Sequence, residues 1–154
     1  MFDSAHYLIW HSYFRWVVLL IMVIQFIWIF VNHKRNKLFT KKDYWLLVFF
    51  TTIYNIQLIL GWTLYLNSLI VENFWQNITV GIKNRQERFF GLEHMTMMNL
   101  GILLANIYMY KSYNFINKEH SFTKLLKSYI WIYLIILSSV PWSFSPLTSR
   151  PDFR

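Results

Sequence analysis

Cysteine is absent from the 154 residues of this chain, and charged residues make up only 14% of them. Without thiols there is no disulfide framework, no thiolate zinc site, no cysteine nucleophile and no covalently attached c-type haem. The chain also lacks an HExxH motif, a glycine-rich phosphate loop and a Ser-His-Asp set, so hydrolytic chemistry has no support. A soluble domain has on average about 25% charged residues, so the low charge already argues against that class.

What the chain has in abundance is apolar and aromatic residues. They amount to 56% and 21% of the sequence, with 8 Trp, 10 Tyr and 14 Phe. A soluble domain of this size could not bury so many rings in one core, and disordered chains are poor in aromatic residues. The composition therefore predicts an integral membrane protein that contacts the lipid bilayer.

Four long stretches with little charge cover residues of about 7–31, 44–70, 88–110 and 124–142. A helix needs about 20 residues to cross a hydrocarbon core of about 30 Å. The fourth stretch reaches that length only if its helix begins near Phe122. We therefore predict an all-α bundle of four transmembrane helices with up-down topology, in a single domain over residues 1–154.

The basic residues predict how this bundle is oriented. Nine Lys and Arg residues lie in the segments after the first and third spans, against five on the opposite side. The positive-inside rule then places both termini on the outer side of the cell inner membrane, in a multi-pass protein. The net charge of +8 is explained by this topology, so no nucleic-acid partner is predicted.

The loop between the second and third spans contains Phe74, Trp75, Ile78 and Ile82 at helical spacing. This pattern predicts a short helix lying in the membrane interface. Uncharged polar residues of the second and third spans, among them Asn55, Gln57, Trp62 and Asn99, are expected to form hydrogen bonds across the bundle.

Ionisable residues inside the spans are the main functional signal, because each costs about 2.5–3.5 kcal/mol at the centre of a membrane helix. They are His11 and Arg15 in the first span and Glu93 and His94 in the third. The two spans run in the same direction, and a rise of about 1.5 Å per residue places the two histidines within roughly 3 Å of the same depth. Two imidazoles at one depth on separate helices are the arrangement that haem ligation by two histidines requires.

Three interpretations of these residues stay open at this point. His11 and His94 are the iron ligands of one haem, with Arg15 and Arg88 available to its propionates. Alternatively, the same cluster binds a quinone or another small ligand. In the third interpretation Arg15 and Glu93 form a structural ion pair, and each histidine forms a hydrogen bond with a neighbouring polar group. His6, His33 and His120 are expected at the surface or in basic loops.

Three short motifs carry a resemblance to a known group of proteins. They are His11-Ser-Tyr-Phe-Arg15-Trp, Arg88-Phe-Phe-Gly-Leu-Glu93-His94 and Val140-Pro-Trp-Ser-Phe. Together they resemble small four-helix membrane proteins of Bacteroidota that are described as cytochrome b-like. The resemblance implies that six residues belong to one outer-side site: His11, Arg15, Arg88, Glu93, His94 and Pro141.

The function predicted from this reasoning is electron transfer by one haem b near the outer face. The haem would exchange electrons with quinol or an external redox partner, within a larger respiratory membrane complex. The alternative is a non-catalytic membrane subunit or assembly factor with a structural Arg-Glu-His cluster.

Overall fold

The computed structural model describes residues 4–142, and every regular element among them is a helix. Four helices are long. They are α1 (Ser4–Lys34), α2 (Lys41–Leu66), α6 (His94–Ser112) and α7 (Ser121–Ser138). Between α2 and α6 lie α3 (Leu69–Gln76), α4 (Ile78–Gly81), α5 (Arg85–Arg88) and the π-helix η1 (Phe89–Glu93), and the 3-10 helix η2 (Tyr113–Phe115) follows α6. The prediction of an all-α fold is confirmed.

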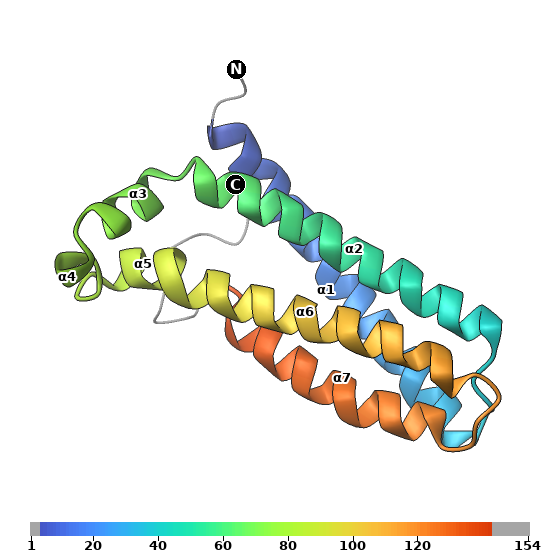
Figure 1. Ribbon diagram of the computed structural model, residues 1–154. Coiled ribbons are helices and arrows are strands. Elements are labelled where there is room, and N and C mark those ends of the chain that lie inside the picture. Colours follow the sequence, from blue (N-terminus) through green and yellow to red (C-terminus); the bar gives the residue numbers. More distant parts are fainter. Residues whose placement is uncertain (1–3, 143–154) are drawn as a thin grey trace.

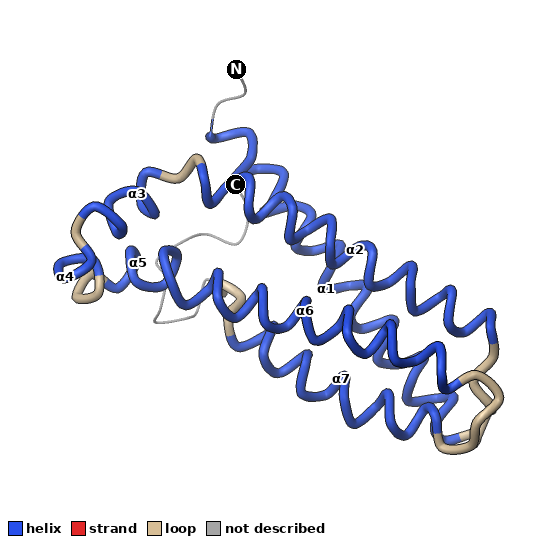
Figure 2. The backbone as a smooth tube through the Cα atoms, viewed as in Figure 1, coloured by secondary structure: helices blue, strands red, loops and turns tan. Residues whose placement is uncertain are grey.

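The long helices run alternately up and down and form a closed ring (Figures 1 and 2). In this ring α1 packs on α2, α2 on α6, α6 on α7, and α7 back on α1. We call the end where α1 and α6 begin the N-terminal end. The opposite end, which carries the segments 35–40 and 116–120, is the lysine-rich end. The short helices α3, α4 and α5 lie together at the N-terminal end, beyond the ring of long helices (Figure 1).

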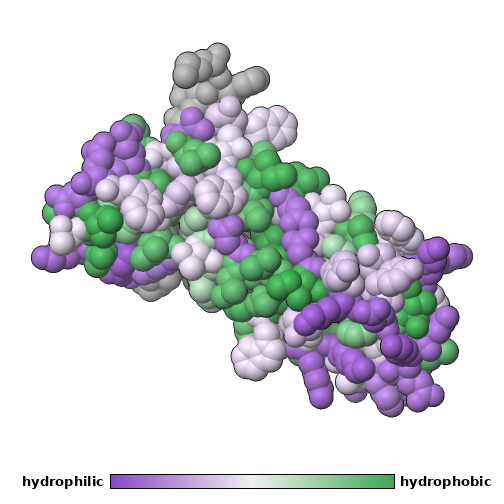
Figure 3. Space-filling view, in the orientation of Figure 1, coloured by the Kyte–Doolittle hydropathy of each residue, from purple (hydrophilic) through white to green (hydrophobic). Residues whose placement is uncertain are grey.

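Three of the long helices are long and apolar enough to cross a membrane: α1 from His6 onward, α2, and α7. They expose many large apolar side chains, such as Trp10 at 66% and Ile59 at 65%, as expected for surfaces that face lipid. Figure 3 shows hydrophobic residues gathered over the middle of the visible face and hydrophilic residues toward both ends. This distribution is that of a multi-pass membrane protein.

Local signals explain where several helices begin and end. Thr40 and Asp43 form a capping box at the start of α2, and Lys37 donates a hydrogen bond of 2.8 Å to Asp43. One helix does not cover the whole predicted stretch of about 44–70, because α2 ends at Leu66 and α3 begins at Leu69. The fourth helix does begin early enough, at Ser121, and it ends at Ser138, three residues before Pro141. The chain thus leaves the helix before a proline whose preceding residue is biased away from helix.

The predicted interfacial helix is present only in pieces. Asn77 ends α3 and its side chain caps α4, so Phe74 and Ile78 belong to separate helices. Phe74 is buried, whereas Trp75, Ile78 and Ile82 are exposed. An exposed apolar face therefore exists, but it does not come from one continuous helix.

Packing is tightest in the half of the bundle toward the lysine-rich end. The buried side chains there include Ile29, Phe39, Leu47, Phe122 and Leu125. In the other half, α6 approaches α7 closely at Gly101, where an added Cβ would lie 2.7 Å from Cγ1 of Ile136. The small residue lets the two backbones come together. The N-terminal half also contains a large cavity, whose wall includes His11, Arg15 and His94.

Candidate functional site

A partly open cavity of about 410 Å³ lies toward the N-terminal end, lined by residues of α1, α2, α3, η1, α6, α7 and the segment after α7. Its wall is mostly apolar, with leucine, isoleucine and methionine side chains from several helices. The polar or ionisable residues in the wall are His11, Ser12, Arg15, Gln57, Tyr65, Asn67, Ser68 and His94. A mostly apolar cavity with a few convergent polar groups is the usual form of a small-molecule site.

His11 and His94 meet in this cavity although 82 residues separate them along the chain. Their ring centroids are 6.4 Å apart, and the ring planes are nearly perpendicular at 87°. The two rings come from α1 and α6, which start at the same end of the bundle. The structure thus brings together the two histidines that sequence reasoning placed at one depth.

The His94 ring is held in one orientation. Its Nδ1 lies 2.7 Å from the carbonyl oxygen of Ser139, just after α7. A carbonyl only accepts, so Nδ1 carries the proton, and in a neutral ring Nε2 then has the lone pair that a metal requires. In histidines that ligate a metal through one ring nitrogen, the other ring nitrogen typically donates to a backbone carbonyl or a carboxylate in this way. Phe89 and Phe90 pack beside the ring, with centroid distances of 5.7 and 6.2 Å.

The His11 ring is held by α2. The Gln57 amide donates a 3.1 Å hydrogen bond to the backbone carbonyl of His11 and lies 3.4 Å from Nε2 of its ring. Gly61 gives the ring space, because a Cβ at that position would be 3.2 Å from Cε1 of His11. The Nδ1 atom of His11 is buried and has no hydrogen-bond partner among the described residues. Such an orphaned nitrogen is unfavourable unless something binds there.

The π-helix η1 precedes His94 directly. In this turn the His94 N–H donates to the carbonyl of Phe89, five residues earlier. π-helical turns are rare and occur frequently at functional sites. The carbonyl of Gly91 within η1 accepts a 2.7 Å hydrogen bond from the Tyr65 hydroxyl, which in turn accepts one from the Trp75 indole at 2.8 Å. These bonds attach η1 to α2 and α3 and so fix the start of α6.

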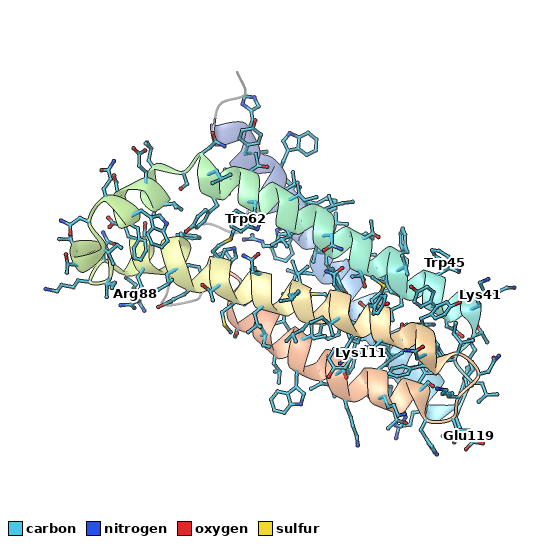
Figure 4. The ribbon with its side chains drawn as sticks, viewed as in Figure 1. Lys41, Trp45, Trp62, Arg88, Lys111 and Glu119 are labelled. Atoms are coloured by element: carbon cyan, nitrogen blue, oxygen red, sulfur yellow. The ribbon has the colours of Figure 1, made fainter. Side chains whose placement is uncertain are left out.

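Glu93 has a different partner from the one predicted by the ion-pair interpretation. Its carboxylate pairs with Nε of Arg88 at 2.8 Å, and no Arg15–Glu93 pair is present. The physical reason is the π turn, which places Glu93 back against the side chain five residues before it. Arg88 also donates to the carbonyl of Ile82. Figure 4 shows Arg88 at the N-terminal end, far from Lys41 and Glu119 at the opposite end.

The six residues singled out by the resemblance do not all line the cavity. His11, Arg15, His94 and Pro141 do, whereas Arg88 and Glu93 lie outside its wall. The last two residues of the third motif, 143 and 144, lie outside the described residues. Arg15 is placed four residues after His11 on α1, with its guanidinium 5.4 Å from the centre of the Trp16 ring.

The remaining histidines lie away from this cavity. His33 is at the lysine-rich end, where its Nδ1 lies 3.0 Å from the hydroxyl of Thr123. His120 is exposed at the same end, and His6 is exposed near the start of α1. Within residues 4–142, no three His, Asp or Glu side chains gather closely enough to hold a metal ion by themselves.

Two residues that shape the site were not predicted from the sequence, and for a third, Gln57, the partner was not predicted. Gly61 and Ser139 were not singled out, although a glycine in an uncharged apolar helix signals a close approach. Gln57 was expected to bond across the bundle, and its partner proves to be His11. The other predicted cross-bundle bonds also form, between Asn55 and Asn106 at 2.9 Å and between Trp62 and Asn99 at 3.2 Å.

No protein-family model, no curated protein and no solved structure matches this chain. The function must therefore be argued from the cavity and the residues in its wall.

Proposed function

We propose that the chain is a four-span protein of the cell inner membrane, with both termini and the cavity on the outer side. Beyond the three apolar helices, α6 would be the remaining span, since it has 19 residues and packs between α2 and α7. At about 1.5 Å per residue its length is about 28 Å, close to the thickness of a hydrocarbon core. The lysine-rich end would face the cytoplasm, in line with the positive-inside rule.

We propose further that this cavity holds one haem b, with His11 and His94 as its two axial ligands. The observation that carries the proposal is the pair of imidazoles facing one apolar cavity from two helices. Two imidazoles that hold one metal must lie close together, because each bonds it through a ring nitrogen. The observed centroid distance is 6.4 Å.

The surroundings of the two rings fit such a group. The Ser139 carbonyl orients the His94 ring. Nδ1 of His11 is buried without a hydrogen-bond partner among the described residues, so a bound group could use it. Gly61 lets the His11 ring pack closely against α2, and the wall is mostly apolar, as a porphyrin requires. When bound, haem would supply one-electron chemistry, and the protein would set its potential through the two ligands and the surrounding apolar wall.

Of the two arginines considered for the propionates, the geometry favours Arg15. It lines the cavity one helical turn from His11. Arg88 lies outside the wall and is already engaged with Glu93 and the Ile82 carbonyl. The Arg88–Glu93 pair would instead stabilise the turn that positions His94.

The proposed activity is electron exchange at the outer face, with quinol or an external redox partner, within a larger respiratory complex. A single centre at one end would receive and return electrons on that side only. The His11–His94 pair is at the N-terminal end, and His33 and His120 at the other end lie in a polar, basic environment unlike the apolar cavity.

The test is a reduced-minus-oxidised visible spectrum with pyridine haemochrome quantification, on protein purified in mild detergent from haem-replete cells. We expect a b-type α-band at about one haem per chain. His11→Ala and His94→Ala should each lose it while circular dichroism shows the helices intact. His33→Ala and His120→Ala are matched controls and should keep it. A colourless, folded wild-type protein would contradict the proposal and favour the non-catalytic subunit. A haem retained in both His11→Ala and His94→Ala would contradict the assignment of these two residues as its ligands.

A further inference from the structure

A second polar cluster lies deeper in the bundle, below the cavity. It consists of Gln25 from α1, Thr51 and Tyr54 from α2, and Tyr129 and Tyr133 from α7. Four of these side chains are at most 1% exposed, and Tyr133 is 7% exposed. So many polar groups inside a membrane bundle are unusual, because polar groups in an apolar interior are unfavourable unless they form hydrogen bonds.

The hydrogen bonds within this cluster leave some of its buried polar atoms without a partner among the described residues. The Tyr54 hydroxyl donates to Oε1 of Gln25, and the Thr51 hydroxyl donates to the carbonyl of Leu47 at 2.9 Å. Three buried atoms have no partner among the described residues: Nε2 of Gln25 and the hydroxyl oxygens of Tyr129 and Tyr133. The two unpartnered tyrosines are neighbours, with ring centroids 5.7 Å apart.

These unpartnered groups are turned toward one another. The hydroxyl of Tyr129 has Thr51 and Gln25 as its polar neighbours, and that of Tyr133 has Tyr54 and Tyr129. None of these approaches has the geometry of a hydrogen bond for the Tyr129 or Tyr133 hydroxyl. As a group these neighbouring side chains offer both donors and acceptors, which is what an internal water molecule binds.

The position of the cluster determines where water can enter. Tyr133 lies three residues before Ile136, and Tyr54 three before Gln57, and both of these later residues line the cavity. One helical turn, about 5.4 Å, therefore separates the cluster from the cavity floor. On the other side, Ile29, Leu47 and Leu125 lie one turn away and are completely buried. The cluster is closed by apolar packing toward the lysine-rich end and adjoins the cavity at the other.

We propose that Gln25, Tyr129 and Tyr133 form an internal water-binding site that fills from the cavity above. The bound water accepts a hydrogen bond from Nε2 of Gln25 and forms further bonds with the two tyrosine hydroxyls. It places a polar, hydrated group about one helical turn beneath whatever occupies the cavity. The inference does not rest on haem and holds for any occupant of the cavity.

X-ray hydroxyl-radical footprinting of the full chain in lipid nanodiscs tests this proposal, because radicals formed from bound water oxidise the side chains beside it. Tyr129 and Tyr133 should be oxidised roughly tenfold faster than Phe39 and Phe122, since only the tyrosines would adjoin water. The two phenylalanines are also buried, at 0% and 2% exposed against 0% for Tyr129 and 7% for Tyr133, and serve as internal references. If the tyrosines are as unreactive as Phe39 and Phe122, the site is dry and the proposal is wrong.

Variants sharpen the result. Gln25→Met keeps the side-chain length and removes the amide, so it should reduce oxidation of both tyrosines to the rate of the phenylalanines. Tyr133→Phe should reduce oxidation of Tyr129, and Tyr113→Phe, which changes an exposed tyrosine, should have no effect. Unchanged oxidation of Tyr129 in both cluster variants would overturn the assignment of these residues. The wild-type comparison stands even if one variant fails to fold.

Discussion

Substitution of Gly91 with alanine should release α3 from the bundle while the four long helices stay intact. A Cβ at Gly91 would lie 2.5 Å from Cγ of Phe74 and 2.7 Å from its Cδ1. The ring has no room to retreat, because a Cβ at Gly81 on its other side would be 2.8 Å from Cδ2. Phe74 is only 1% exposed, so the added methyl group must expel it.

The magnitude follows from two opposing effects. Exposing a buried phenylalanine costs about 1.5–3 kcal/mol, and replacing glycine by alanine in a helix returns about 1 kcal/mol. The net loss of about 0.5–2 kcal/mol should speed amide exchange in residues 69–82 by about 2- to 30-fold. Hydrogen–deuterium exchange with mass spectrometry, in nanodiscs, measures this segment separately from the long helices.

A double-mutant cycle provides the control for the Gly91 prediction. In a Phe74→Ala background the clash is gone, so Gly91→Ala should no longer increase exchange in this segment. An equal increase in both backgrounds, or no increase in the wild-type background, would refute the contact between Phe74 and the π turn as the cause.

Three further substitutions test the packing of the bundle. Asp43→Ala removes the acceptor for Lys37 and for the Thr40 backbone N–H and hydroxyl. It should lower the free energy of unfolding by about 1–2 kcal/mol, seen as a lower melting temperature. Glu119→Ala at the same end is the control and should not change the melting temperature. Gly101→Ala adds a methyl group that pushes α6 away from Ile136 on α7 and should lower the free energy of unfolding by about 1–3 kcal/mol. A melting temperature equal to that of the wild type would mean that α6 and α7 are further apart than described. Asn55→Leu alone should destabilise more than Asn55→Leu with Asn106→Leu, since the single change leaves Oδ1 of the partly buried Asn106 without its donor, although Nδ2 keeps the Ile102 carbonyl; the reverse order in the melts would contradict that pairing.

The helical fold and the depth of the histidines were predictable from the sequence because both depend on regular geometry. Apolar runs of sufficient length predict helices, and a constant rise per residue predicts which side chains share a depth. His11 and His94 illustrate this, since counting residues from the ends of their helices was enough to bring them together.

The partners of Glu93 and His94 were not predictable, because they depend on irregular backbone. The π turn at Phe89–Glu93 adds a residue to the helical register, so Glu93 meets Arg88 and not Arg15. His94 is oriented by a carbonyl at Ser139, beyond the end of a helix whose last residue a hydropathy pattern does not define. The buried cluster of Gln25, Tyr129 and Tyr133 was missed because tyrosine at helical spacing is indistinguishable from ordinary packing residues in a membrane sequence.

The measurement that tests the central claim most directly is electron paramagnetic resonance of the oxidised wild-type protein. Two imidazole ligands make ferric haem low-spin, and ring planes near 87° apart make its signal strongly anisotropic. We therefore expect a low-spin, highly anisotropic ferric signal, accounting for about one haem per chain, that disappears in His11→Ala and in His94→Ala. A high-spin signal in the wild type, or a folded protein with no haem signal, would contradict the assignment of His11 and His94 as a pair of axial ligands.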